Sequence, residues 1–261
     1  MSDPSHDDTP RGGWGPLTPL GEALRFLTVL PTPGMAPPSA EGMLDGVRAF
    51  PLAGWVIGGF GALWALLLGP FLSPDLLAWG VLAAWFLVNR GLHLDGIADV
   101  SDAVFSSRTR ERMLEILKDS RIGTMGALSL IFVLAGQWMA LSDTGRDLWI
   151  AALAAPALGR GTSLYGMRRF PPLGESGLGA QLRLAAKTPD VLLWALVTLV
   201  IPLALVVGPI PAGLAILACI LTAEIAGGAL VRTLGGLSGD GYGVLVELGQ
   251  LAALLVWAAT L

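Results

Sequence analysis

The sequence contains a single cysteine and few charged residues, and both shortages narrow the class of protein. With one cysteine, Cys219, no disulfide framework can form, and its place in an apolar run is typical of a thiol buried in a helix. Charged residues make up only 14% of the 261 residues, whereas 54% are hydrophobic. This balance lies outside the usual soluble range and indicates an integral membrane protein. One continuous soluble core is the alternative, and the shortage of charge disfavours it.

The first residues also lack the apolar core of a secretory signal peptide. Residues 1–19 are expected to be a disordered polar tail. Residues 20–261 are expected to form a single integral-membrane catalytic domain. At its start, the segment 20–30 is too short to cross a bilayer and carries Glu22 and Arg25, which favours a helix at the membrane interface.

Long, nearly uncharged windows predict the fold. They approach the ~20 residues that a transmembrane helix needs, although the window 76–88 is short unless it continues to about Leu94. The windows are 52–70, 76–88, 124–141, 148–166, 191–208, 210–230 and 242–261. We therefore expect an all-α fold, a polytopic transmembrane helical bundle with about seven spans and a polar catalytic segment on the cytoplasmic side. In the first window Gly54 and Gly58 would let another helix approach closely, although such pairs are common in glycine-rich spans.

The distribution of lysine and arginine predicts the orientation. If the segment 89–123 faces the cytoplasm, 15 of the 16 basic residues lie on that side and only Arg146 lies outside. Basic residues are enriched in cytoplasmic loops of membrane proteins. We expect a multi-pass protein of the cytoplasmic (inner) membrane, with the N-terminus in, the C-terminus out and the active site facing the cytoplasm.

The segment 89–123 concentrates the ionisable groups of the chain. It contains six acidic and six basic residues between two runs that carry almost no charge. Membrane proteins rarely keep so many ionisable side chains in one place without using them. The sequence therefore places the chemistry here.

Three aspartates share one face of a predicted helix over residues 91–105, which lack proline: Asp95, Asp99 and Asp102. At 100° per residue they fall within about 60° of one another, so their carboxylates repel unless a cation lies between them. Hard oxygen ligands favour Mg²⁺ or Mn²⁺, and His93 is the only nitrogen ligand nearby, which disfavours zinc. A solvated helix face paired with Arg90 and Arg108 is the alternative.

A second helix is expected over residues 109–120, with a polar stripe on one side. Beside the aspartates, Glu115 and Asp119 would extend the cation site, while Lys118 and Arg121 would hold phosphate oxygens. The alternative is a surface helix with local ion pairs, each worth only ~0.2–0.5 kcal/mol.

Further candidates lie in the second half of the chain. Arg160 is the first of three arginines at or beyond the end of the fourth predicted span, where it would bind phosphate or fix the topology. Glu224 lies within a predicted span and is either functional or paired with Arg232. Glycines surround Asp240 in a segment suited to a tight turn or a close approach to a ligand, and Glu247 follows seven residues later.

Four segments resemble the adenosylcobinamide-GDP ribazoletransferase family, also called cobalamin-5′-phosphate synthase: FPLAGWVIGG (50–59), GLHLDGIADVSDA (91–103), LEILKDSRIGTMGAL (114–128) and LGGLSGDGYGVLVEL (234–248). The shorter RFLTVLPTPG (25–34) is similar to the N-terminal signature of that family. The matches run in the right order from about residue 20 to the C-terminus, and the second and third segments are the most specific.

The resemblance implies an enzyme of the last stage of cobalamin biosynthesis, in which the nucleotide loop is assembled. Members transfer the cobinamide-phosphate moiety of adenosylcobinamide-GDP to α-ribazole or α-ribazole 5′-phosphate. GMP is released, and adenosylcobalamin or its 5′-phosphate is formed. Members lie in the cytoplasmic membrane and need Mg²⁺. The expected partners are therefore both substrates and the lipid bilayer, with no nucleic acid, and a homo-oligomer is left open.

This reaction gives each candidate residue an expected role. The metal ligands would be Asp95, Asp99, Asp102, Glu115 and Asp119. The catalytic set would be Asp99, Asp102, Lys118 and Arg121, with one of the two aspartates accepting the hydroxyl proton. The substrate-binding set would be Arg90, His93, Arg108, Arg160 and Asp240.

Two other functions are retained as alternatives. A CDP-alcohol-phosphotransferase-like membrane enzyme also attacks a pyrophosphate with an alcohol, but the D-x3-D-x2-D spacing found here differs from that family's signature. An ion-coupled transporter would use acidic residues near the middle of the membrane, a demand that Glu224 alone meets. Solute uptake into proteoliposomes would favour the transporter, and GMP release would favour the transferase.

Overall fold

Helices form the regular structure of the chain, as the sequence predicts. The structure is a computed structural model that describes residues 13–119 and 121–261. Over these residues no strand occurs, and a single isolated bridge joins Pro172 to Leu237. The all-α class is therefore confirmed.

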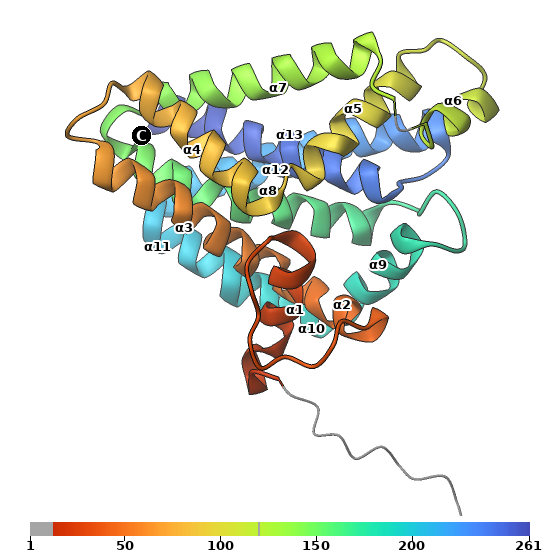
Figure 1. Cartoon of the computed structure of the whole chain (residues 1–261), viewed down its shortest axis with the longest axis horizontal. Coiled ribbons are helices and arrows are strands. Elements are labelled where there is room, and N and C mark those ends of the chain that lie inside the picture. The colour runs from red at the N-terminus through yellow and green to blue at the C-terminus, as the bar shows by residue number, and fades with distance from the viewer. Residues whose placement is uncertain (1–12, 120) are drawn as a thin grey trace, which may run out of the picture.

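The long helices coincide with the predicted windows (Figure 1). They are α3 (Phe50–Leu68), α4 (Pro74–Asn89), α7 (Thr124–Asp143), α8 (Leu148–Arg169), α12 (Pro209–Leu234) and α13 (Gly239–Thr260). The predicted window 191–208 is a run of three pieces, α10 (Asp190–Ala195), η4 (Leu196–Val200) and α11 (Ile201–Val207). The remaining helices are η1 (Gly15–Leu17), α1 (Thr18–Leu27), α2 (Ala40–Gly46), η2 (Val47–Ala49), α5 (Leu92–Val104), α6 (Arg110–Ile116), η3 (Gly145–Asp147) and α9 (Leu178–Ala186).

Helical structure begins slightly before the predicted domain boundary at residue 20. Residues 1–12 of the predicted tail lie outside the described residues, whereas η1 and α1 already occupy residues 15–27. One side of α1 packs on α2 and α3 and buries Ala23 and Leu27. Its predicted place at the membrane interface stays a prediction.

Five helical stretches are long and apolar enough to cross a membrane, and a sixth qualifies if α4 and α5 form one broken span. The five are Ala40–Leu68, Thr124–Asp143, Asp190–Val207, Pro209–Leu234 and Gly239–Thr260. Within the described chain the predicted span 148–166, helix α8, is not among them, because it carries Arg160 and several small polar residues. The polytopic bundle is confirmed, but the count of about seven spans is not.

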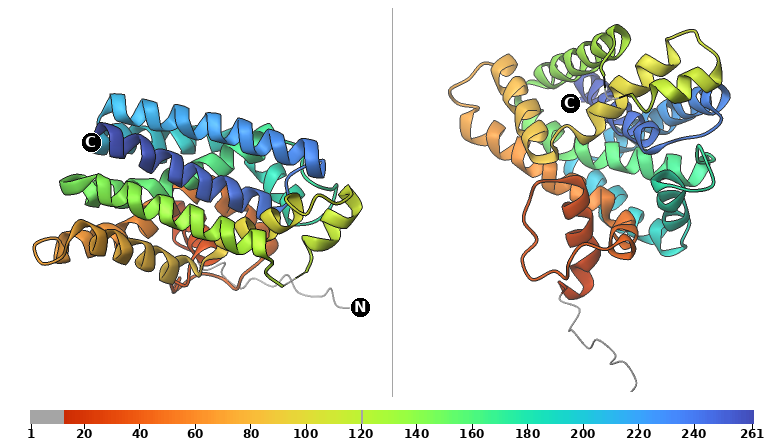
Figure 2. Two further views of the ribbon diagram at one scale, coloured as in Figure 1. Left: turned by 90° about the horizontal axis from the view of Figure 1, so that it is seen from above. Right: turned by 45° about the vertical axis from the view of Figure 1, so that its right-hand side comes forward.

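The outer faces of these helices expose large apolar side chains. Phe132 on α7, Leu205 on α11 and Ile225 on α12 are 74%, 81% and 74% exposed. Soluble proteins rarely leave large contiguous apolar patches in water, so these faces suit contact with a lipid bilayer. Figure 2 shows α7, α12 and α13 running side by side along the length of the bundle.

Helix α8 lies inside the bundle and packs against α3, α12 and α13. Its contact with α3 is close because glycine stands at the crossing. A Cβ added at Gly54 would lie 2.5 Å from the Cα of Ala157, and one at Gly58 would lie 1.9 Å from the carbonyl oxygen of Leu153. Gly54 and Gly58, the glycine pair noted in the sequence, therefore let α3 and α8 pack closely against each other.

Replacing Gly58 by alanine is expected to destabilise the protein by about 1–3 kcal/mol, because the added methyl group overlaps the backbone of α8 and forces the helices apart. Gly59→Ala is the matched control, since a Cβ there meets nothing within 4 Å. Thermal unfolding in detergent measures both variants. Equal midpoints for the two variants would show that the α3–α8 contact is not tight.

A sharp corner between α4 and α5 sets the direction of α5, the first helix of the polar segment. Arg90 (φ 56°) and Gly91 (φ 64°) both adopt the left-handed conformation, and the helix axes differ by 94°. The side chain of Asn89 supports the corner by accepting a hydrogen bond from the backbone N–H of Gly91 at 2.8 Å. As a result α5 does not continue the line of α4 but packs across α7 and α13.

Candidate active site

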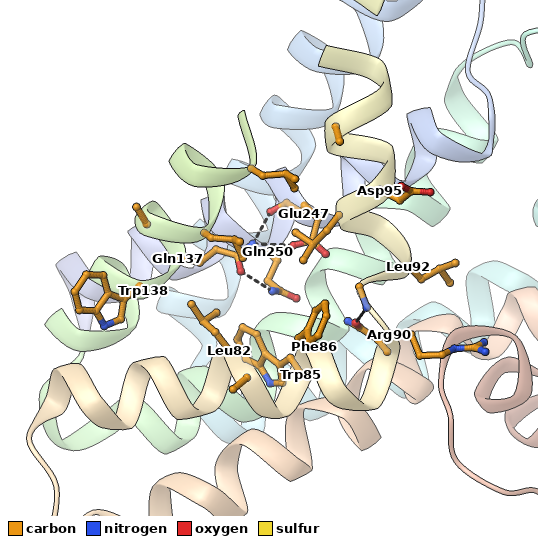
Figure 3. A pocket seen from close by; sticks show the side chains of 18 of the residues that line it. Leu82, Trp85, Phe86, Arg90, Leu92, Asp95, Gln137, Trp138, Glu247 and Gln250 are labelled. Atoms are coloured by element: carbon orange, nitrogen blue, oxygen red, sulfur yellow. Dashed lines mark hydrogen bonds between the residues drawn. The ribbon is translucent and has the colours of Figure 1, made fainter. Parts of the chain in front are cut away.

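A cavity of about 920 Å³ opens between α4, α5, α7 and α13 (Figure 3). Its apolar wall comes mainly from α4 and α7: Trp79, Leu82, Phe86, Leu130, Leu134 and Trp138. Its polar rim comes from the corner and from α5: Asn89, Arg90, Asp95 and Asp99. A volume of this size, with mostly apolar walls and a few polar groups, is typical of a site for a ligand larger than a simple metabolite.

Carboxylates gather at the rim, where α5 crosses the start of α13. Gly96 permits the crossing, because a Cβ there would lie 2.6 Å from the backbone oxygen of Asp240. Partial burial raises the pKa of Asp99 to about 6, and neighbouring carboxylates add to the shift. In decreasing order of effect these neighbours are Asp95, Asp240 and Asp102. Asp240, which the sequence predicted to bind substrate, thus comes to lie near Asp95 and Asp99.

Asp102 has a different role from the one that the helical spacing predicted. Its carboxylate accepts hydrogen bonds from the backbone N–H groups of Gly123 at 2.6 Å and Gly126 at 2.8 Å. These groups begin α7, so Asp102 caps that helix from a distant part of the chain. Both oxygens are used in this way, which corrects the prediction that Asp102 is a primary metal ligand.

Asp102→Ala is expected to lower the free energy of unfolding by about 1–3 kcal/mol, because two charge-assisted hydrogen bonds to a helix N-terminus are lost. Asp143→Ala, at the other end of α7, serves as the control and is expected to change stability by less than about 0.5 kcal/mol. Chemical unfolding of both purified variants provides the comparison. Full stability of Asp102→Ala would contradict the capping role.

The predicted second helix is shorter than expected and its charges are paired locally. It spans α6 (Arg110–Ile116) rather than 109–120, and Ser120 lies outside the described residues. Glu115 forms an ion pair with Arg112, and Asp119 forms one with Arg121 at 2.6 Å.

These pairs keep two predicted ligands away from the cavity. The hydrogen bonds from Arg121 lower the pKa of Asp119 to about 2. Among the described residues that line the cavity, neither Glu115 nor Asp119 occurs, and Lys118 and Arg108 are exposed on the same segment. The predicted cage of five carboxylates is therefore not assembled, and the alternative of a surface helix with local ion pairs describes α6.

Two predicted substrate-binding residues lie behind the cavity wall rather than on it. Arg160 is 1% exposed and His93 is 9% exposed, and the Arg160 guanidinium contacts His93 Nδ1 at 3.4 Å. Neither is among the described lining residues, so the fold gives them no direct contact with a bound phosphate. The predicted pairing of Glu224 is also different. Its partners are Arg169 at 2.8 Å and Tyr165 at 2.6 Å, not Arg232.

The cavity wall contains polar residues that the sequence reading missed. Gln137 on α7 and Gln250 on α13 line it, together with Glu247, and all three are at most 4% exposed. An available signal was the position of two glutamines inside apolar windows, where an uncharged polar side chain needs a partner.

Apolar helices around a cavity with an acidic rim define a polytopic helical membrane protein with a site for a ligand that has a large apolar face. Comparison with known proteins narrows this class. The model of the family described as cobalamin-5-phosphate synthase matches residues 19–258, and the chain belongs to this family.

Curated relatives carry one name, adenosylcobinamide-GDP ribazoletransferase. The chain is 42% identical to the relative from Roseiflexus sp. (strain RS-1) over 97% of its own length and 93% of the relative's. It is 42% identical to the relative from Herpetosiphon aurantiacus, over 92% of its own length and 96% of the relative's. It is 41% identical to the relative from Klebsiella pneumoniae (strain 342), over 89% of its own length and 96% of the relative's. No solved structure matches the chain.

Proposed function

We propose that this protein is an adenosylcobinamide-GDP ribazoletransferase that uses α-ribazole, or its 5′-phosphate, as the acceptor. The observation that carries the proposal is a single cavity that joins an apolar wall to a carboxylate-rich rim. A corrinoid ring with a nucleoside diphosphate attached has the matching shape, with a broad, largely apolar face and a charged end. The family match and the names of the relatives support the same activity.

The bonds that change in this reaction indicate which roles the residues at the rim of the cavity have. The acceptor hydroxyl attacks the phosphorus on the cobinamide side of the diphosphate, the bond to the GMP oxygen breaks, and GMP leaves. A carboxylate at the rim takes the proton of that hydroxyl, and Asp99, which lines the cavity, is assigned this role. Arg90 lines the same rim and is placed to hold phosphate oxygens through its fork of N–H donors.

The rim fits a divalent cation of the Mg²⁺ type. Asp99 is crowded by three carboxylates, and none of the described basic side chains opposes the shift of its pKa. In the described chain no three potential ligands stand close enough to bind a metal alone. This suits Mg²⁺, which takes one or two carboxylates and completes its shell with water and phosphate oxygens. Asp95 and Asp99, which both line the cavity, would hold the ion, which would neutralise charge on the leaving GMP.

We also propose that the protein lies in the cytoplasmic membrane, with its N-terminus and the acidic rim of the cavity on the cytoplasmic side. It rests on the bias of basic residues toward the side of α5 and α6. Impermeant thiol reagents test it in spheroplasts of a Cys219→Ala background. Labelling of Arg146→Cys and protection of Ser107→Cys are expected, and the reverse pattern would overturn the orientation.

GMP release by the purified protein in lipid nanodiscs tests the activity. With adenosylcobinamide-GDP, α-ribazole and Mg²⁺, chromatography is expected to show equal amounts of GMP and of the new corrinoid. Omission of α-ribazole separates transfer from hydrolysis, because transfer needs the acceptor. Release of CMP from a CDP-alcohol, or solute uptake into proteoliposomes without any GMP release, would instead support the phosphotransferase or transporter alternatives.

A further inference from the structure

A chain of hydrogen bonds crosses the inner wall of the cavity from a buried cation to a buried anion. The Arg160 guanidinium donates to Oε1 of Gln250 at 3.4 Å, and Nε2 of Gln250 donates to Oε1 of Gln137 at 3.2 Å. Nε2 of Gln137 then donates to Oε2 of Glu247 at 2.9 Å. Figure 3 shows the last three residues on the cavity wall, joined by these bonds.

The charged ends fix the direction of every bond in this chain. A guanidinium can only donate and a carboxylate can only accept, so each glutamine must turn its oxygen toward Arg160 and its nitrogen toward Glu247. Bonds aligned in this way polarise one another in a medium of low dielectric constant. The positive and negative charges also offset each other inside the bundle, where a single buried charge would be costly.

The chain leaves hydrogen-bonding capacity unused on two residues that line the cavity. Among the described residues, Oε1 of Glu247 receives no hydrogen bond, although this side chain is only 4% exposed and lines the cavity. The amide nitrogen of Gln250 has two hydrogens, and the chain uses one of them. Glu247 and Gln250 stand three residues apart on α13, hence on the same helix face.

We infer that Glu247 and Gln250 form a subsite that binds a primary carboxamide on the edge of the corrinoid. An amide N–H donates to Glu247, and the amide oxygen accepts from Gln250. A carboxylate would be repelled by Glu247, and an ester has no hydrogen to donate. Arg160 acts as a positioning residue. Its guanidinium binds Oε1 of Gln250, so Nε2 of Gln250 points away from Arg160. The inference rests on the proposed function, since it is the cobinamide moiety that carries such amides.

Binding of two corrinoids tests the subsite: dicyanocobinamide, which carries amides, and the heptamethyl ester of dicyanocobyrinic acid, in which esters replace them. The ratio of their dissociation constants is measured by absorption titration of the full-length protein in nanodiscs. The double variant Arg160→Met, Glu247→Met removes the acceptor of the amide N–H together with both buried charges. It is expected to reduce the preference for the amide ligand by about 5- to 150-fold, the factor that corresponds to 1–3 kcal/mol for an unpaired polar group. Gln181→Met, on the exposed side of α9, is the matched control and should keep the wild-type ratio.

Gln250→Met should weaken the binding of both corrinoids and leave the ratio nearly unchanged, because the ester carbonyl accepts a hydrogen bond from Gln250 as the amide carbonyl does. Both dissociation constants are measured on the same variant, so a fraction of unfolded protein affects both equally and leaves their ratio unchanged. A substitution that only perturbs the structure would therefore not change the ratio. An unchanged ratio in the variant Arg160→Met, Glu247→Met would overturn the subsite, even if GMP release by the wild type upholds the proposed function. Loss of the ratio in that variant with no GMP release by the wild type would uphold the subsite and reject the proposed function.

Discussion

Asp99→Asn is expected to lower kcat for GMP release by at least about 10³-fold. Asparagine has nearly the same shape as aspartate but neither accepts the acceptor's proton at neutral pH nor neutralises a cation, so a general base and a ligand are lost together. Affinity for the cobinamide portion should change little, because the apolar wall on α4 and α7 is untouched. Rapid-quench measurement of GMP, together with corrinoid titration, separates these two quantities.

Glu111→Gln is the control for this experiment. Glu111 is an exposed acid on α6 outside the lining of the cavity, so the same chemical change there should leave kcat within about twofold. The account would be wrong about Asp99 if the Asp99→Asn variant released GMP at more than about a tenth of the wild-type rate.

Arg90→Gly is expected to separate stability from activity. Arg90 holds a positive φ of 56°, a conformation that costs an L-residue about 1 kcal/mol and that glycine adopts freely. The variant should therefore unfold at the same denaturant concentration as the wild type or a higher one. Activity should fall by about 10²-fold, since the guanidinium that would hold the diphosphate at the rim is missing. Unfolding curves and steady-state kinetics on the same preparation give both values.

Ser107→Gly is the matched control for Arg90→Gly. Among the described residues, Ser107 is the other non-glycine with a positive φ, at 54°, and it lies in the turn after α5, outside the cavity lining. It should gain a similar small amount of stability without losing activity. A loss of stability in Arg90→Gly with normal turnover would mean that Arg90 shapes the corner and does not bind substrate.

Local patterns in the sequence were sufficient for the helices and for part of the site. Uncharged windows predicted the positions of the long helices, because apolar length is a property of contiguous residues. The proline-free run with Asp95 and Asp99 became α5, and the glycine-flanked Asp240 came to lie beside it. The 94° corner was not predicted, since helix direction depends on how α5 packs against α7 and α13.

The errors arose where a side chain's partner is distant in the sequence. Asp102 was assigned by helical spacing, but its oxygens bind the start of α7, more than 20 residues later. Arg160 was predicted to bind phosphate or to fix the topology from its place near the end of a span, yet α8 lies inside the bundle and buries this side chain. In each case the local pattern was read correctly, and tertiary packing decided the function of the residue.

The central claim is that Asp95 and Asp99 hold a divalent cation together with the diphosphate of the substrate. Its most direct test is the pulsed electron paramagnetic resonance spectrum of Mn²⁺ added to the purified protein with adenosylcobinamide-GDP in the absence of acceptor. The account predicts phosphorus hyperfine coupling to Mn²⁺ in the wild type and in Glu111→Gln, and its loss in Asp99→Asn. Equal phosphorus coupling in all three proteins, or none in the wild type, would contradict it.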